Sequence, residues 1–211
     1  MSLKSSGIST RIGIVCAISA IVPFTTFASH ASAQSLDNLQ DRTAKSKMLA
    51  SGSNLSVLPD TLNLVKHYEG FRSYAYLDTS GLPVVGYGLS RIDGKNVVLG
   101  QHITPAQADI ALERELYRIQ NIVKSHVQVK LNPHQLGALT SLVYNAGTRV
   151  LTNSTLIRKL NAGDYIGAAK EFPRWNKANR GGRLVVFPGL TKRRLAEQKL
   201  FLTPYRQIAS N

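Results

Sequence analysis

Apolar residues follow two different spacings along the chain, and the change comes near residue 103. Between residues 59 and 99 they form short runs separated by turn residues, as expected for one helix and a few strands. After residue 103 they recur every three to four positions, the spacing of amphipathic helices. We therefore predict an α+β fold that is mostly helical, in which a long helix joins a small helix-plus-β-hairpin lobe to a larger helical lobe.

The first predicted helix ends at an acidic residue. Asp60 is suited to cap a helix over residues 61–68, and Gly70 is suited to stop it. Glu69 then falls at the helix C-terminus, where the negative end of the helix dipole disfavours an anion. Glu69 is therefore a candidate proton donor.

Two turns predict a small antiparallel sheet after this helix. The aromatic and β-branched residues between positions 74 and 89 are split by Asp78-Thr79-Ser80-Gly81, a turn signal between two strands. A second turn at residues 93–96 precedes a short strand at residues 97–99. Asp78 is thus expected where a strand ends.

Helix signals account for the chain beyond residue 103. Thr104, Pro105 and Gln107 form a capping box with a first-turn proline, and they begin the long helix. Asn132 begins the next helix, and Gly147 ends it. Further helices are predicted at residues 154–160, 164–172 and 188–202.

Residues 1–33 have the three parts of a secretory signal peptide. Lys4 and Arg11 precede the apolar stretch IGIVCAISAIVPF, and the small residues ASHASA follow it. We expect cleavage after Ala33; the alternative is an uncleaved signal that anchors the chain in a membrane. The next residues, 34–57, are polar and serine-rich, which predicts a flexible N-terminal segment.

The chain is strongly basic, with 26 Lys and Arg against 12 Asp and Glu and a formal charge of +14. Loss of the signal would remove two of these cationic residues, Lys4 and Arg11, which leaves +12. Such a charge favours polyanionic partners, and export makes nucleic acid the weaker choice. Cys16 would leave with the signal, which excludes zinc–thiolate sites, disulfides and cysteine nucleophiles from the mature chain. The stretch Arg180–Arg183 is expected to be a flexible basic loop that either contacts anionic glycan or is a solvent-exposed linker.

Glu69 and Asp78 together suit the cleavage of a glycosidic bond. One carboxyl group must stay protonated to donate to the leaving oxygen, while the other stays ionised to orient water or balance positive charge on the sugar. Glu69, at its helix end, is suited to the role of the proton-donating acid. Asp78, in a more solvated turn, is suited to the role of the ionised carboxylate. In the non-catalytic alternative, Glu69 is an acidic residue on the surface and Asp78 only forms the turn.

Further residues accompany the two acids. Glu69-Gly70-Phe71-Arg72 is followed by Tyr76, Asp78, Gly81 and Gly86-Tyr87-Gly88. This stretch resembles the active-site segment of phage-type lysozymes, glycoside hydrolase family 24, including the eight residues between glutamate and aspartate. The likeness continues over roughly residues 60–203, in LVYNAG at 142–147, STLI at 154–157, LNAGD at 160–164, Phe172, Trp175, Pro188-Gly189-Leu190, Arg193, Arg194 and Glu197.

The resemblance implies a lysozyme-like catalytic domain over residues 58–211, with two lobes around a cleft. Glu69 and Asp78 would be its catalytic residues. Val84 occupies the slot where the family usually has a threonine, and Leu89 stands where a histidine is often found. Valine lacks the hydroxyl group that would help to hold the attacking water. The water-positioning step and the rate are therefore in doubt, while the fold is not.

The resemblance also assigns residues in the helical lobe. Tyr144, Asn145 and Gly147 match the family's helix end at the cleft and would bind substrate; alternatively, Asn145 and Gly147 only end the helix. Arg194 aligns with an arginine that pairs with the catalytic glutamate in the family, and it would order the acid. The alternative for this arginine is a solvated basic helix face. Trp175 is interpreted as a core residue, with a sugar-stacking platform as the alternative.

By this resemblance the chain is a secreted muramidase that cleaves the β-1,4 bond between N-acetylmuramic acid and N-acetylglucosamine in peptidoglycan. It would act in bacteriolysis or wall remodelling as a secreted or periplasmic monomer without metal or cofactor. Its partners would be glycan strands and anionic wall surfaces rather than nucleic acid. Only the N-terminal segment, before its cleavage, would contact a membrane. Two alternatives remain: a peptidoglycan-binding protein impaired at Val84, and a cationic protein that perturbs membranes.

Overall fold

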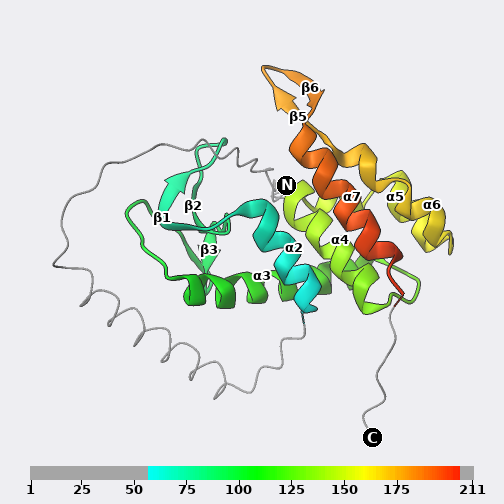
Figure 1. Ribbon diagram of the computed structural model, residues 1–211, viewed down its shortest axis with the longest axis horizontal. Helices are drawn as coiled ribbons and strands as arrows, with labels where there is room; N and C mark the ends of the chain where they lie inside the picture. Colours follow the sequence, from blue (N-terminus) through cyan, green and yellow to red (C-terminus); the bar gives the residue numbers. More distant parts are fainter. Residues whose placement is uncertain (1–56, 205–211) are drawn as a thin grey trace, which may run out of the picture. The chain divides into compact units, whose positions relative to one another are not determined.

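A computed structural model describes residues 57–204 (Figure 1). The predicted signal at residues 1–33 lies outside the described residues, as does the predicted flexible segment up to residue 56. The described chain divides into two compact units, residues 57–118 and residues 119–204, with the boundary inside one long helix. The mostly helical α+β class predicted from the sequence is confirmed.

The first unit begins with helix α2, Pro59–Glu69. Its N-cap is Leu58, whose side chain makes no capping bond, so the prediction that Asp60 caps the helix is wrong. The helix starts earlier because Pro59 has no N–H to satisfy at the first position, which leaves Asp60 in the first turn. Gly70, at φ 69°, ends the helix at Glu69 as predicted.

Two short hairpins follow α2. Strands β1 (Arg72–Leu77) and β2 (Pro83–Gly86) are antiparallel, and so are β3 (Arg91–Ile92) and β4 (Lys95–Asn96). The strand predicted at residues 97–99 is wrong, because the second hairpin pairs directly across its two-residue turn. Asp93 and Gly94 take positive φ values of 49° and 79° there, the conformation that closes tight hairpins.

Helix α3, Pro105–His126, supports the hairpins of the first unit. The predicted capping box is present: the Gln107 N–H donates to Thr104 Oγ1 at 3.2 Å, and the Thr104 N–H donates to Gln107 Oε1 at 3.0 Å. Figure 1 shows β1, β2 and β3 beside the N-terminal half of α3. The core of this unit includes Val65, Val84, Val85, Tyr87, Leu89, Val97, Ile103, Ala108, Leu112 and Leu116.

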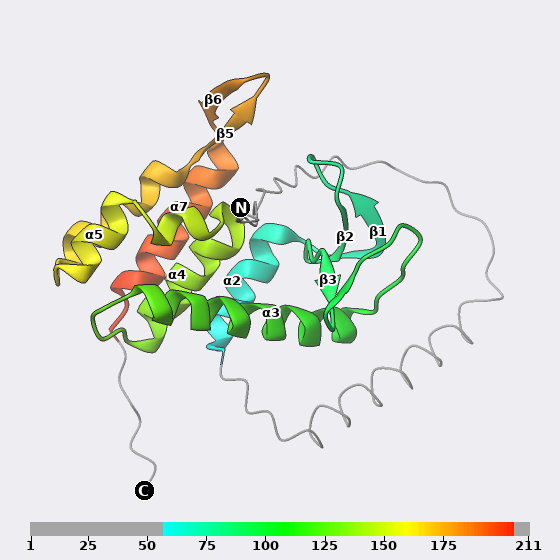
Figure 2. The ribbon, with the colours of Figure 1, turned by 180° about the vertical axis from the view of Figure 1, so that it is seen from behind.

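The second unit is built around helix α4, Pro133–Ala146, which Asn132 caps with Gln135 as its capping-box partner. Helix α4 is buried on nearly all sides and packs against α7, Pro188–Leu202, as both Figure 1 and Figure 2 show. A buried hydrogen bond of 2.7 Å from Ser141 Oγ to Glu197 Oε1 joins the two helices. The predicted positions of both helices are confirmed.

Short elements connect α4 to α7: η1 (Thr148–Leu151), α5 (Thr155–Asn161), α6 (Tyr165–Ala169) and η2 (Phe172–Trp175). The helix predicted over residues 164–172 ends early, at Ala169. Pro173 contributes to this, because it lacks the N–H that would donate to the Ala169 carbonyl in a continued α-helix, and the chain passes into η2 there.

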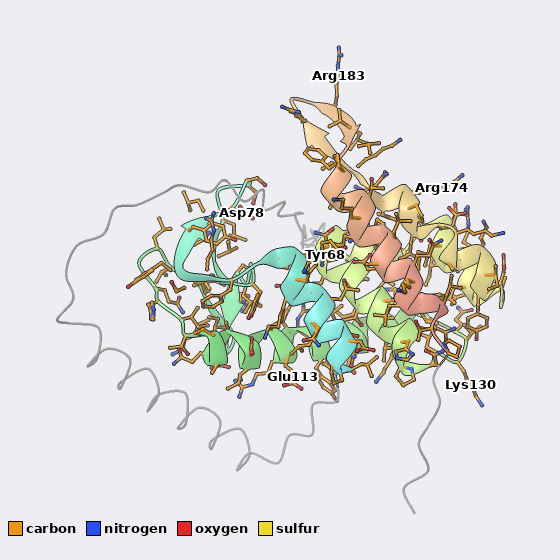
Figure 3. The ribbon with its side chains drawn as sticks, viewed as in Figure 1. Tyr68, Asp78, Glu113, Lys130, Arg174 and Arg183 are labelled. Atoms are coloured by element: carbon orange, nitrogen blue, oxygen red, sulfur yellow. The ribbon has the colours of Figure 1, made fainter. Side chains whose placement is uncertain are left out.

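A third hairpin is formed by β5 (Lys177–Arg180) and β6 (Arg183–Val186). The prediction of a loop at Arg180–Arg183 is therefore wrong in part, since these residues close a hairpin. Gly181 and Gly182 have φ values of 60° and 84° and make the two-residue turn. Figure 3 shows Arg183 pointing away from the tip of this hairpin.

Candidate active site

The end of α2 lies against a tight glycine loop. Val85 and Leu89 exchange two backbone hydrogen bonds of 2.9 Å, which close the loop Gly86-Tyr87-Gly88. A Cβ atom built on Gly88 would lie 3.8 Å from Glu69 Oε2, so the loop backbone runs next to the carboxyl group. Glu69 is only 9% exposed. The predicted acid is therefore held at a helix end and largely shielded from water.

The two glycines of this loop have different roles. Gly86, at φ 64°, lies so close to α3 that a Cβ atom would meet Ala108 Cβ at 3.1 Å. Its small size therefore allows the strand to pack on α3. Gly88, at φ 84°, is the glycine that approaches the acid. The sequence motif contains both glycines but does not distinguish these roles.

Three side chains tie α2, the glycine loop and α3 together. Lys66 Nζ lies 2.8 Å from Asp109 Oδ2, and the Tyr87 hydroxyl donates to Asp109 Oδ1 at 2.9 Å. Burial pulls the pKa of Lys66 down, but the hydrogen bond and charge of Asp109 outweigh it and raise this pKa. Burial, the bond to Asp109 and its charge raise the pKa of Tyr87. Sequence analysis did not identify this network, which fixes the two segments that flank the acid.

Asp78 is held in the turn at the end of β1. Its Oδ1 accepts hydrogen bonds from the Ser80 N–H at 2.8 Å, the Ser80 hydroxyl at 2.7 Å and the Leu82 N–H at 2.8 Å. Three donors on one oxygen favour the ionised carboxylate. The turn predicted from the sequence is confirmed, and Figure 3 labels Asp78 at this end of the hairpin.

Tyr76 lies within electrostatic range of both acids. Burial raises the pKa of its phenol; the positive charge of Arg72 opposes this, and the negative charges of Glu69 and Asp78 raise the pKa further. The Arg72 guanidinium carbon stands 4.3 Å from the centre of the Tyr76 ring. Tyr76 belongs to the sequence motif, but sequence analysis gave it no role.

Val84 lies on β2 and is only 4% exposed. It pairs across the hairpin with Tyr76. Leu89, in the other position where the chain departs from the family pattern, is also buried. Both departures therefore place apolar side chains in the core of the first unit.

The predicted substrate-binding residues lie at the end of α4 in the second unit. Gly147, at φ 81°, is the C-cap of α4, and its N–H donates to the Val143 carbonyl at 2.8 Å. The helix-ending role of Gly147 is therefore confirmed. Asn145 is buried within the last turn, so it is not the cap, and Tyr144 beside it is half-buried.

Arg194 is fully buried on α7, and Arg193 is 2% exposed. Both contact Glu197: Arg194 Nη2 donates to Oε1 at 2.8 Å, and Arg193 Nε donates to the same oxygen at 3.1 Å. Arg194 Nε also lies 2.8 Å from Oε2, an ion-pair contact that is poorly aligned for a hydrogen bond. The alternative of a solvated basic face is wrong for these two arginines. The ordering of Glu69 by Arg194 stays a prediction.

A polar hollow of ≈ 480 Å³ opens on the second unit between η1, α5 and η2. Trp175 is only partly buried and lines this hollow, so it is not one of the fully buried core residues that the sequence interpretation expects. The hollow is otherwise lined by Arg149, Thr152, Asn153, Ser154, Thr155, Leu156, Glu171 and Arg174. Within residues 57–204, no group of three or more His, Cys, Asp or Glu side chains could hold a metal ion.

Comparison with known proteins identifies the family of this chain. The family model described as phage lysozyme matches residues 66–197, which include Glu69, Asp78, Val84 and Arg194. The chain belongs to the phage lysozyme family. A curated endolysin of Acyrthosiphon pisum secondary endosymbiont phage 1 is 41% identical over 140 residues, 66% of this chain and 93% of that protein. A SAR-endolysin of Pseudomonas phage phiKMV is 34% identical over 142 residues, 67% of this chain and 86% of that protein.

Solved structures agree with this membership. The endolysin from Escherichia coli O157:H7 phage FAHEc1 has a TM-score of 0.65 and 33% identity, covering 74% of this chain and 99% of its own. The muramidase domain of SpmX from Asticaccaulis excentricus has a TM-score of 0.64 and 30% identity, covering 71% and 99%. The chain thus has the lysozyme-like fold and is a glycoside hydrolase of the lysozyme type.

Proposed function

We propose that this phage lysozyme family member is a secreted muramidase that hydrolyses the β-1,4 bond between N-acetylmuramic acid and N-acetylglucosamine in peptidoglycan. The observation that carries the proposal is the setting of Glu69: 9% exposed, at the negative end of α2 and against the Gly88 backbone. A carboxyl group that is largely shielded from water at a helix end is the kind of group that general-acid catalysis uses.

The two acids take different steps. Glu69 donates its proton to the glycosidic oxygen as the bond to the leaving sugar breaks. Asp78, with three donors on Oδ1, stays ionised and either orients the attacking water or balances the positive charge on the sugar ring. The contrast between a shielded acid and a hydrogen-bonded carboxylate supports this division of roles.

The second unit supplies substrate contacts in this proposal. Tyr144, Asn145 and Gly147 bind the glycan from the end of α4. Amide and phenol groups can hydrogen-bond the hydroxyl and N-acetyl groups of a sugar, which supports this assignment. Arg194 orders the catalytic acid, because a buried guanidinium offers a rigid, permanently charged donor fork.

Export accompanies this activity, since peptidoglycan lies outside the cell membrane. The basic start, apolar centre and small residues of positions 1–33 support cleavage of a signal peptide, and the SAR-endolysin relative is compatible with an exported protein. No helix within the described part of the chain is long and apolar enough to cross a membrane. The mature monomer would use its charge of +12 to concentrate on anionic wall material in wall remodelling or lysis.

Chemical analysis of the reaction products tests this proposal. Purified peptidoglycan is incubated with the protein, and the new reducing ends are reduced with borohydride and identified by mass spectrometry. Reduced N-acetylmuramic acid is the expected new end, whereas reduced N-acetylglucosamine would contradict the bond assignment. In parallel, leakage of dye from vesicles without peptidoglycan is expected to stay at background, which separates the muramidase from a membrane-perturbing protein.

Val84 supports one second candidate, a peptidoglycan-binding protein that has lost turnover. The buried valine offers no hydroxyl group for the attacking water. In that case the protein would sediment with peptidoglycan and release no new reducing ends. Detectable turnover by the native protein rules this candidate out.

A further inference from the structure

Tyr76 is the cross-strand partner of Val84, the residue that stands where the family usually has a threonine. We propose that the Tyr76 phenol supplies the hydroxyl group that Val84 lacks, and that it helps Asp78 to hold the attacking water. This inference rests on the proposed muramidase function and concerns how the same site positions water in this chain.

The hairpin register brings the two residues together. Tyr76 of β1 and Val84 of β2 are directly opposite each other in an antiparallel pair. Side chains of opposed residues point to the same face of the sheet, with Cβ atoms about 4.5–5.5 Å apart. A group on Tyr76 therefore projects over the same face as the missing threonine hydroxyl.

Arg72 fixes the direction of the Tyr76 ring. Its guanidinium carbon is 4.3 Å from the ring centre, a cation–π contact. The strand pairing is irregular between Arg72 and Tyr76. The Tyr76 side chain is half-buried. A stacked and partly buried ring loses little additional freedom when its hydroxyl group binds water, so the arrangement is suited to a positioning task.

The charges of both acids reach the phenol. Burial and the carboxylates of Glu69 and Asp78 together keep the pKa of Tyr76 above its usual value, although Arg72 opposes them. The phenol therefore stays protonated at neutral pH, with one O–H donor and lone pairs that accept. Such a group can donate to a carboxylate and accept from a water molecule at the same time.

In the proposed step, the water oxygen forms the new bond to the anomeric carbon while the glycosidic C–O bond breaks. The Glu69 proton goes to the leaving oxygen, and the proton lost by water goes to the Asp78 carboxylate. Tyr76 keeps its own proton throughout. It accepts a hydrogen bond from the water and directs the oxygen lone pair towards the sugar.

Removal of the phenol oxygen tests the proposal. Tyr76→Phe keeps the ring under Arg72 and deletes only the hydroxyl, so turnover on peptidoglycan is expected to fall on the order of tenfold with KM little changed. Val84→Thr is the matched rescue variant. It should restore most of the turnover in the Tyr76→Phe background, and its gain there should exceed its gain in the native background, as expected for two positions that share one task.

Other outcomes overturn the inference. Tyr76→Phe with native turnover would show that the hydroxyl holds no water, and failure of Val84→Thr to rescue a slow Tyr76→Phe would show that the two positions do not share a task. Thermal unfolding of each variant identifies a change in stability. If the native protein hydrolyses peptidoglycan and Tyr76→Phe does so at the same rate, only the inference fails. If the native protein releases no sugar, the proposed function fails as well.

Discussion

The backbone of Gly88 lies against the carboxyl group of Glu69, so closely that a Cβ atom on Gly88 would stand 3.8 Å from Oε2. Gly88→Ala would place a methyl group beside the acid and force an L-residue into a positive φ of 84°. We expect this variant to lose about 1–2 kcal/mol of unfolding free energy, and to lose activity as well. Urea unfolding and sugar release from peptidoglycan measure the two effects.

Gly94 provides the matched control. It has a similar φ of 79°, and nothing lies within 4 Å of a Cβ atom built there. Gly94→Ala should cost a similar stability through backbone strain and leave turnover within a few-fold of native. If both alanine variants retain full activity, contact between the Gly88 loop and the acid has no part in catalysis.

Asp78 has a turn-forming role that can be separated from a catalytic one. Asn at this position keeps an oxygen that accepts from the Ser80 and Leu82 N–H groups but removes the charge. Asp78→Asn is therefore expected to unfold within about 0.5 kcal/mol of native. Its turnover is expected to fall by about 10²-fold or more.

Ser80→Ala is the control for this substitution. It removes one donor to Asp78 and keeps the charge. Turnover close to native is expected for this variant. Native turnover by Asp78→Asn itself would show that the residue only forms the turn, as the alternative interpretation of the sequence holds.

The sequence located the acid and its partner because local signals determine both positions. Gly70 ends α2 directly after Glu69, and the turn after β1 depends on Asp78 and the residues that follow it. Such short-range relationships can be predicted from chemistry and spacing. The hairpin closed by Gly181 and Gly182 also has a local signal, two glycines between strand-like residues, which the prediction of a loop leaves unused.

Other parts of the site depend on contacts between distant residues. Lys66 and Asp109 are 43 positions apart, and Tyr87 joins them from a third element. The closeness of Tyr76 to both acids depends on hairpin register and on the path of the chain after α2. No periodicity in one sequence encodes such pairings. The burial of Arg194 with Glu197 is a further example, because the basic composition of α7 favours an exposed helix face.

Glu197 balances two buried arginines, Arg193 and Arg194. Glu197→Ala leaves both cations in the core without this carboxylate, so we expect a loss of about 3–5 kcal/mol in unfolding free energy. Glu115→Ala, which removes the partner of the exposed Arg118, should cost about 0–1 kcal/mol. Urea unfolding of the two variants compares them, and equal losses would contradict the importance of burial.

Glu171 predicts a pH-dependent contribution to stability. Its hydrogen bond from Lys159 outweighs burial and, with the charge of Arg174, lowers the pKa of this carboxyl group. The resulting stabilisation is present above the usual pKa of 4.5 and is lost as the pH falls through the lower folded value. Glu171→Gln should therefore be less stable than native at pH 7, and the difference should shrink below pH 4.5 in urea unfolding.

Glu113 offers a control of opposite sign, because burial raises the pKa of its carboxyl group. Ionisation of Glu113 opposes folding above that pKa, so Glu113→Gln should be more stable than native at neutral pH. This gain should also disappear in acid. If both glutamine variants shift stability in the same direction at pH 7, the assigned causes of the two pKa shifts are wrong.

The central claim is that Glu69 donates the proton that breaks the glycosidic bond. The most direct measurement is the turnover of Glu69→Gln on purified peptidoglycan beside the native protein, with Glu115→Gln as a surface control. Loss of general-acid catalysis predicts a fall of about 10²–10⁴-fold for Glu69→Gln, with a native rate for the control. Turnover of Glu69→Gln within a few-fold of the native rate would contradict the claim.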